Sequence, residues 1–98
     1  MDLRRFITFK TVVEEGSFLR AAQKLCCTQS TVTFHIQQLE QELAIPLFEK
    51  IGRRMCLTAA GKKVLPHVYA LTKVMASIRQ AARQDDEPAG ALRVATGE

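Results

Sequence analysis

The segment between Thr28 and Pro46 limits the possible folds more than any other part of the chain. Its apolar residues are spaced by four, three and four positions: Val32, Ile36, Leu39 and Leu43. This spacing places them in one stripe along an α-helix. Thr28 can cap the start of that helix, and Pro46 would stop it. A helix with one apolar stripe needs other elements to cover it, so the chain should fold around this helix.

Two shorter helices are predicted before it. Residues 3–15 carry Leu3, Phe6, Phe9 and Val13 at helical spacing, and Gly16 tolerates the left-handed backbone that ends a helix. Ser17 can cap a second helix of about two turns, which the Cys26-Cys27 pair ends. Two short helices joined by a turn of a few residues are typical of a helix-turn-helix.

The face of the third helix opposite the apolar stripe is almost free of charge. At about 100° per residue, this outer face carries Ser30, Phe34, Gln37 and Gln41, with Thr33 and Gln38 beside them. A polar helix face of this kind is either a binding surface or simply solvated.

A β-hairpin is predicted after the third helix. Residues 47–50 and 55–58 have the composition of two short strands, and residues 51–54 would form the turn between them. Leu57 would face inward, and Arg53 and Arg54 would lie at the tip. A hairpin in this position would form the wing of a winged helix-turn-helix.

A long helix follows, capped by Thr58 and running to about residue 84. Its apolar residues alternate steps of four and three, as in a coiled-coil seam: Val64, Val68, Leu71, Met75, Ile78 and Ala82. Pro66 should bend the helix without ending it. The seam can pair with a second copy of the chain, or its first half can pack on the chain's own first helix.

Residues 85–98 have a different composition. Residues 85–90 suggest a hinge, and residues 91–95 suggest the first half of a buried strand with no partner in this sequence. We expect three parts: a winged helix-turn-helix at residues 1–58, a linker or dimerisation helix at 59–84, and a hinge with the start of a truncated regulatory domain at 85–98.

The charge distribution suggests a polyanionic partner. The net charge is +4, and residues 1–84 contain 13 basic and 6 acidic side chains. Basic surfaces favour nucleic acids because bound phosphates release counterions. A membrane role is not expected, since there is no Trp, one Tyr and no sufficiently long apolar run. We expect a cytoplasmic protein.

Enzyme and metal functions find little support. His35 and His67 lie on separate predicted helices, and there is no glycine-rich phosphate loop. Adjacent Cys26 and Cys27 are poorly placed to chelate zinc, so no metal site is expected. Cys27 is better explained by core packing, with thiol sensing by Cys26 as the alternative.

A set of residue types recurs at fixed spacing along these elements: Glu15-Gly16-Ser17-Phe18, Ala21-Ala22, Leu25, Gln29, Ile36, Leu39-Glu40, Leu43, Leu47-Phe48, Arg53, Leu57-Thr58 and Gly61. Over residues 1 to about 84, this set resembles the LysR-type transcription regulators of bacteria. The resemblance implies a mainly α fold, in which a winged helix-turn-helix precedes a linker helix that pairs antiparallel with its twin. It also implies a homodimer, or a tetramer of the full-length protein, and a small-molecule effector bound by a further C-terminal domain. No cofactor is expected in these 98 residues.

Four positions depart from the family pattern: Ser30 replaces a usual proline, Thr33 a serine, Ala44 a glycine and Lys50 an arginine. Ala44 is the oddest, because the residue after a helix end often needs positive φ. Phe34 is also uncommon on an outward face. These changes affect the target sequence more than the fold.

The predicted partner is double-stranded DNA. The predicted contact residues are Thr28, Gln29, Ser30, Thr31, Thr33, Phe34, Gln37, Arg53 and Arg54. Glutamine amides can address adenine, and Phe34 can pack on a thymine methyl. Arginines at a hairpin tip suit a narrow minor groove, although solvated arginines are the alternative. The rival hypothesis is a winged-helix module for protein interaction or oligomerisation, which an apolar patch on the same face would favour.

Overall fold

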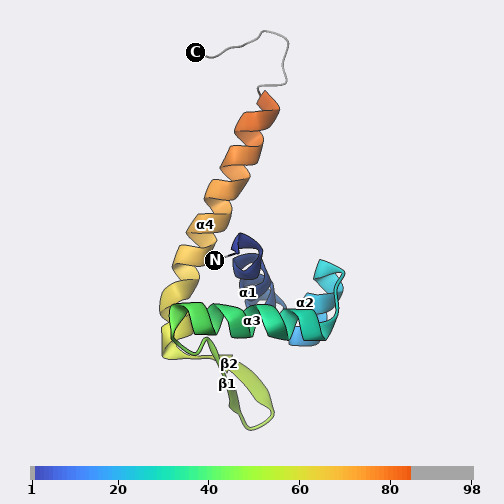
Figure 1. Cartoon of the computed structure of the whole chain (residues 1–98), viewed down its shortest axis with the longest axis vertical. Helices are drawn as coiled ribbons and strands as arrows, with labels where there is room; N and C mark the ends of the chain where they lie inside the picture. Colours follow the sequence, from blue (N-terminus) through green and yellow to red (C-terminus); the bar gives the residue numbers. More distant parts are fainter. Residues whose placement is uncertain (1, 85–98) are drawn as a thin grey trace.

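The computed structural model describes residues 2–84, which form three short helices, a two-stranded hairpin and a long helix (Figure 1). The elements are α1 (Leu3–Glu15), α2 (Phe18–Leu25), α3 (Gln29–Leu43), β1 (Phe48–Ile51), β2 (Arg54–Leu57) and α4 (Ala59–Gln84). This order confirms the predicted mainly α architecture. The predictions for residues 85–98 lie outside the described residues.

The helix starts are capped by side chains, as the sequence suggested for α2 and α3. Ser17 Oγ accepts a hydrogen bond from the Arg20 amide, and Thr28 Oγ1 accepts one from the Thr31 amide. The Asp2 carboxylate caps α1 in the same way, and its hydrogen bond from the Arg4 side chain lowers the pKa of that carboxyl. Each cap satisfies an amide that the first turn leaves free.

Each of the first three helices ends in left-handed backbone. Gly16 has φ 72°, as predicted, but Cys26 and Ala44 take φ 59° and 58° with side chains attached. The unusual position of Ala44 is therefore confirmed, at a cost of about 1 kcal/mol relative to glycine. Cys26 was expected only to end α2. Its amide bonds back to the carbonyls of α2, which closes the turn of the helix-turn-helix.

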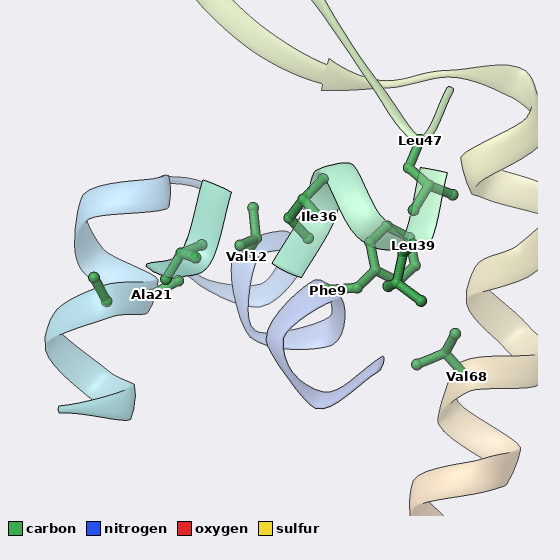
Figure 2. Close-up of a cluster of buried hydrophobic side chains, with 9 residues drawn as sticks. Phe9, Val12, Ala21, Ile36, Leu39, Leu47 and Val68 are labelled. Carbon is green, nitrogen blue, oxygen red and sulfur yellow. The ribbon is translucent and has the colours of Figure 1, made fainter. Parts of the chain in front are cut away.

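The core lies where α1, α2 and α3 meet, and the first half of α4 closes one end of it (Figure 2). Val32, Ile36 and Leu39 are at most 3% exposed, so the predicted stripe of α3 is the buried one. Phe48 lies against Phe9 and Phe18, with both ring-centroid distances at 5.5 Å and edge-on geometry. Cys27 is among the partly buried residues packed on this core, as predicted.

The hairpin pairs β1 antiparallel to β2, with Phe48 opposite Leu57 and Ile51 opposite Arg54. The predicted turn at 51–54 was too wide, because Ile51 and Arg54 are ladder partners and only Gly52 and Arg53 lie between the strands. Gly52 has φ 65°, a backbone conformation that glycine adopts without steric cost. The short turn is therefore built on Gly52.

The base of the hairpin is held by two side chains, Glu40 of α3 and Thr58, the residue between β2 and α4. Glu40 Oε2 accepts hydrogen bonds from the Leu47 and Phe48 amides at 2.8 and 3.3 Å. Thr58 Oγ1 donates to the Pro46 carbonyl at 2.6 Å and accepts from the Gly61 amide at 2.9 Å. The segment before β1 is thus fixed both to α3 and to the start of α4.

The two halves of α4 differ in burial. Val68 is only 2% exposed and belongs to the core of its own chain, whereas Val74 and Ile78 are 56% and 64% exposed. Val68, one of the predicted dimerisation residues, packs within its own chain, which is the alternative that the seam left open for its first half. Pro66 lies inside the continuous helix and does not end it. Figure 1 shows the second half of α4 extending away from the helical body.

Candidate nucleic-acid interface

The outward face of α3 begins at its N-terminal cap. Gln29, Ser30 and Gln37 are exposed and Thr33 is half-buried, so these four polar side chains border one surface. Thr28 and Thr31 are already engaged with each other, because their hydroxyl oxygens are 2.9 Å apart and Thr28 caps the helix. Gln29, Ser30, Thr33 and Gln37 are therefore the predicted contact residues best placed for an external partner.

A groove on the surface joins α3 to the hairpin. Its lining combines the start of α2, the start of α3 and the hairpin: Gly16, Ser17, Phe18, Leu19, Gln29, Thr33, Arg53, Arg54, Met55 and Cys56. The fold thus brings Gln29 and Thr33 to the same concave surface as the two arginines, from segments about 20 residues apart in sequence. Four of the predicted contact residues therefore line one groove: Gln29, Thr33, Arg53 and Arg54.

The two hairpin arginines differ in position. Arg53 lies in the turn itself, whereas Arg54 is the first residue of β2 and is paired with Ile51. Both are exposed. Among the described ion pairs neither arginine appears, so their guanidinium groups can meet an external anion.

Phe34 interrupts the polar face with a ring that is 51% exposed. The Arg5 guanidinium carbon lies 5.8 Å from its ring centroid, and Arg5 also pairs with Glu42 at 3.3 Å. Nothing in the local sequence predicted this contact, because it depends on how α1 crosses α3.

A second apolar surface lies beside the first half of α4. A shallow groove with little polar surface is lined by Phe6, Leu43, Val64, His67, Val68 and Leu71. Of the predicted dimerisation residues, Val64, Leu71 and Met75 are half-buried, and Ile78 and Ala82 are exposed. Val74 was not in the predicted seam, yet it is exposed beside Leu71 and Ile78. Its apolar side chain, three residues after Leu71 and four before Ile78, could have placed it in the seam.

No metal site was expected among the histidines and cysteines of residues 2–84. Residues 2–84 contain no cluster of three or more His, Cys, Asp or Glu side chains that could hold a metal ion. His35 is occupied structurally, with its Nδ1 atom 2.9 Å from the Thr8 hydroxyl. Cys26 is exposed and Cys27 half-buried, both as free thiols. None of the described helices has the length and hydropathy needed to cross a bilayer.

The geometry is that of a helix-turn-helix with a basic wing, and the sequence comparisons identify its family. The family model "Bacterial regulatory helix-turn-helix protein, lysR family" matches residues 3–62, which is more than half of the chain. The chain belongs to the LysR family. The resemblance that the motifs suggested is therefore confirmed.

Curated relatives of this chain include HTH-type transcriptional regulators of Escherichia coli and Bacillus thuringiensis. The chain is 74% identical over 98 residues to the uncharacterized HTH-type transcriptional regulator YfiE of Escherichia coli (strain K12). It is 39% identical over 98 residues to the HTH-type transcriptional regulator CzcR of Bacillus thuringiensis (strain Al Hakam). Both matches cover the whole of this chain but only 33% of the relative. The chain spans about a third of the length of these relatives.

Solved structures with the same fold include complexes with DNA. The BenM_DBD/benA site 1 DNA complex superposes with a TM-score of 0.82 at 33% identity, covering 90% of this chain and 99% of that one. The full-length CbnR complex with its target DNA gives a TM-score of 0.77 at 30% identity, covering 85% of this chain and 29% of that one. These matches confirm the winged helix-turn-helix fold.

Proposed function

We propose that this chain is the DNA-binding part of a bacterial LysR-type transcription regulator, which binds double-stranded DNA in a sequence-specific way and controls promoter activity. The observation that carries the proposal is the continuous surface on which Gln29 and Thr33 of α3 border Arg53 and Arg54 of the hairpin. The DNA complexes among the similar structures support the same reading.

The two halves of this surface would do different work. The N-terminal half of α3 fits the major groove, where glutamine amides can donate to and accept from an adenine edge. Arg53, projecting from the turn, would enter the adjacent minor groove, whose negative potential is greatest where A·T tracts narrow it. The buried stripe of Val32, Ile36 and Leu39 holds α3 so that both contacts are presented together.

Assembly and regulation follow from the family and from α4. A homodimer through the exposed half of α4, with tetramers of a full-length protein, would place two copies of α3 in successive major grooves. A small-molecule effector would bind a separate C-terminal domain, and residues 85–98 would contain the hinge and the start of that domain. Residues 1–58 would then be the DNA-binding domain and 59–84 the linker helix of a cytoplasmic regulator without catalytic activity.

The direct test is selection of binding sites by this chain from a random double-stranded DNA library. We expect an interrupted palindrome, because two copies would each read one half-site. Gln29→Ala should alter the preferred base at one position in each half-site. Gln23→Ala, on the exposed side of α2, is the matched control and should leave the selected sequence unchanged. If no sequence is enriched, specific recognition by this chain is refuted.

Two further measurements separate DNA binding from the rival protein-interaction module. Phosphate contacts should make affinity fall steeply with salt, whereas apolar protein contacts would hold or strengthen. Arg53→Ala should weaken binding by about 1 to 3 kcal/mol, mostly on duplexes with A·T-rich flanks. If this variant binds every duplex with the same affinity as the original chain, Arg53 is not part of the interface.

A further inference from the structure

Phe34 is the exception on the polar face of α3. Its ring is 51% exposed, although aromatic side chains usually bury most of their large apolar surface. Its neighbours on the same concave surface are Gln29, Ser30, Thr33 and Gln37. An aromatic ring placed among the candidate base-reading residues offers a partner apolar contact and no hydrogen bond.

Two side chains lie close to this ring. The guanidinium carbon of Arg5 lies 5.8 Å from the ring centroid, within the range of a cation–π contact. The His35 ring lies beside it, with the centroids 6.3 Å apart and the planes tilted by 54°. Phe34 therefore lies close to Arg5 and His35 and still leaves about half of its surface exposed.

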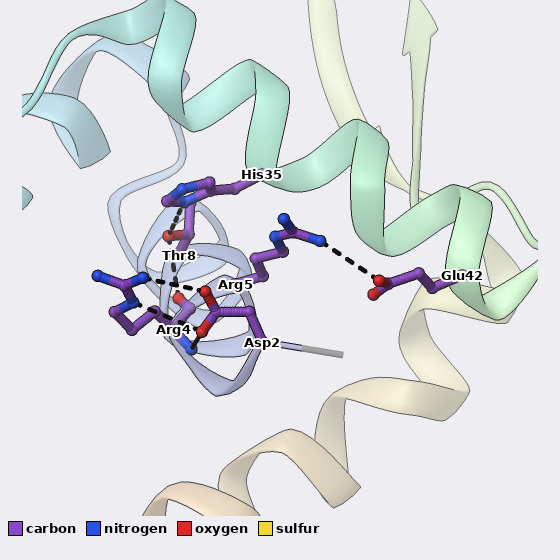
Figure 3. Close-up of polar contacts among 6 residues, drawn as sticks. All are labelled: Asp2, Arg4, Arg5, Thr8, His35 and Glu42. Atoms are coloured by element: carbon purple, nitrogen blue, oxygen red, sulfur yellow. Dashed lines mark hydrogen bonds and ion pairs between the residues drawn. The ribbon is translucent and has the colours of Figure 1, made fainter.

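Both supporting side chains are themselves anchored (Figure 3). Arg5 Nη1 lies 3.3 Å from Oε2 of Glu42, which is on α3 about two turns after Phe34. His35 Nδ1 lies 2.9 Å from the hydroxyl of Thr8, which in turn donates to the Arg4 carbonyl. The Nε atom of Arg5 is buried and has no hydrogen-bond partner among the described residues.

Building on the proposed function, we propose that Phe34 reads the C5 methyl group of a thymine in the major groove and that Arg5 is a positioning residue for its ring. The thymine methyl is the one apolar group that base pairs present in that groove. A phenyl ring has no donor for a phosphate and none for the other base edges, so the methyl is the feature it can distinguish. The inference names a specificity determinant within the same site.

Deoxyuridine tests this directly, because it differs from thymidine only by the absence of that methyl group. Each thymine of the selected duplex is replaced in turn by deoxyuridine, and the affinity of the chain is measured. At one position in each half-site we expect affinity to fall about fourfold, the effect of one buried carbon group. Phe34→Ala should bind more weakly but equally to the thymine and uracil duplexes.

Arg5→Lys keeps the positive charge near Glu42 but removes the planar group that lies against the ring. We expect the uracil penalty at the Phe34 position to shrink toward none, because the ring is no longer held in place. Arg4→Lys is the matched control, since Arg4 is the neighbouring arginine and pairs with Asp2 instead. This control should keep the full penalty.

The possible outcomes separate this inference from the proposed function. If the chain selects a site but no thymine shows a uracil penalty, or Phe34→Ala retains the penalty, Phe34 does not read a methyl group. A protein partner would then be the better explanation of the exposed ring. If Arg5→Lys fails to fold, the Phe34→Ala comparison still decides the methyl contact. If no site is selected at all, the proposed function fails and this inference fails with it.

Discussion

The two halves of α4 have similar apolar composition but opposite surroundings. In the first half, Gly61 is buried and Val68 is 2% exposed, because α1, α3 and the base of the hairpin pack against them. In the second half, Val74 and Ile78 are more than half exposed. One continuous helix therefore contains a part that belongs to the domain core and a part that no other element of residues 2–84 covers.

This difference shows that a coiled-coil spacing does not identify its own partner. Val64, Val68 and Ile78 all follow the same steps of four and three. Val64 and Val68 pack on the core of their own chain, whereas Ile78 is exposed. Substitutions in the first half should therefore change the stability of the single chain. Substitutions in the second half should change association, provided that a second copy covers this face.

The largest expected effect is from Val68→Ala. Removing buried methyl groups and leaving a cavity should lower the free energy of unfolding by about 2 kcal/mol. The matched variant Val74→Ala should change it by less than about 0.5 kcal/mol at concentrations where the chain is monomeric. Urea denaturation of both variants measures the contrast. Equal losses would mean that the two halves are equally buried in solution.

Gly61→Ala should have the next largest effect. A Cβ at this position would lie 2.5 Å from the Leu47 carbonyl oxygen and 2.8 Å from Leu57 Cδ2. We expect a loss of about 1 to 2 kcal/mol by overpacking, although alanine favours helices. In the exposed half no close contact opposes a side chain, so alanine is favoured over glycine there. Ala76→Gly should therefore lower the free energy of unfolding by about 1 kcal/mol through helix propensity alone. Thermal unfolding of the two variants measures both effects. A Gly61→Ala variant that is more stable than the original chain would contradict the close packing of Gly61 against Leu47 and Leu57.

Ile78→Ser tests the second half by association. If a second copy covers this face, loss of the buried side chain should raise the dimer dissociation constant about tenfold, equivalent to about 1.4 kcal/mol. Analytical ultracentrifugation over a concentration series measures this constant. Gln80→Ser, exposed on another side of the helix, is the control. An unchanged constant in Ile78→Ser would exclude this residue from the interface.

The smallest expected effect concerns the contact between α4 and α1. Partial burial and then the negative charge of Glu14 raise the pKa of Tyr69 above its ordinary value of 10.0, and the Tyr69 hydroxyl donates to Glu14 at 3.3 Å. Because the neutral phenol is favoured in the fold, its contribution to stability is complete below that ordinary value and is lost as pH rises through the folded pKa.

Tyr69 is the single tyrosine, and the chain has no tryptophan, so phenolate absorbance reports this residue alone. We expect a titration midpoint above the ordinary value in the folded chain and a lower midpoint in Glu14→Gln. Glu15→Gln, whose carboxylate pairs with Lys24 instead, is the control. A midpoint that does not respond to Glu14→Gln would show that the contact is absent in solution.

Local signals in the sequence predicted the helices closely. The caps Ser17 and Thr28 and the stop at Gly16 act within one turn of backbone, so their positions fix the element boundaries. The hairpin was predicted less well, because strand pairing brought Ile51 and Arg54 into register and narrowed the turn. In the candidate site, the sequence predicted Gln29, Thr33, Arg53 and Arg54 as contact residues. It did not predict that the four would line one groove.

The contacts that escaped prediction join residues far apart in sequence. Arg5 meets Phe34, and Tyr69 meets Glu14, only because helices cross at particular angles. The left-handed Cys26 escaped for a different reason, since cysteine rarely adopts positive φ and the residue type gave no signal. The DNA contacts, the dimer residues and the domain boundaries stay predictions.

One face of α3 packs in the core and the opposite face is exposed. This separation affects how the binding preference of such a domain can change in evolution. The residues that hold the helix in place are Val32, Ile36 and Leu39, whereas Gln29, Ser30 and Gln37 contribute little to the core. Exposed positions of this kind usually tolerate exchange within about 0.5 kcal/mol of stability. A lineage can therefore change the outward face one residue at a time, acquiring new preferences while the scaffold is inherited unchanged.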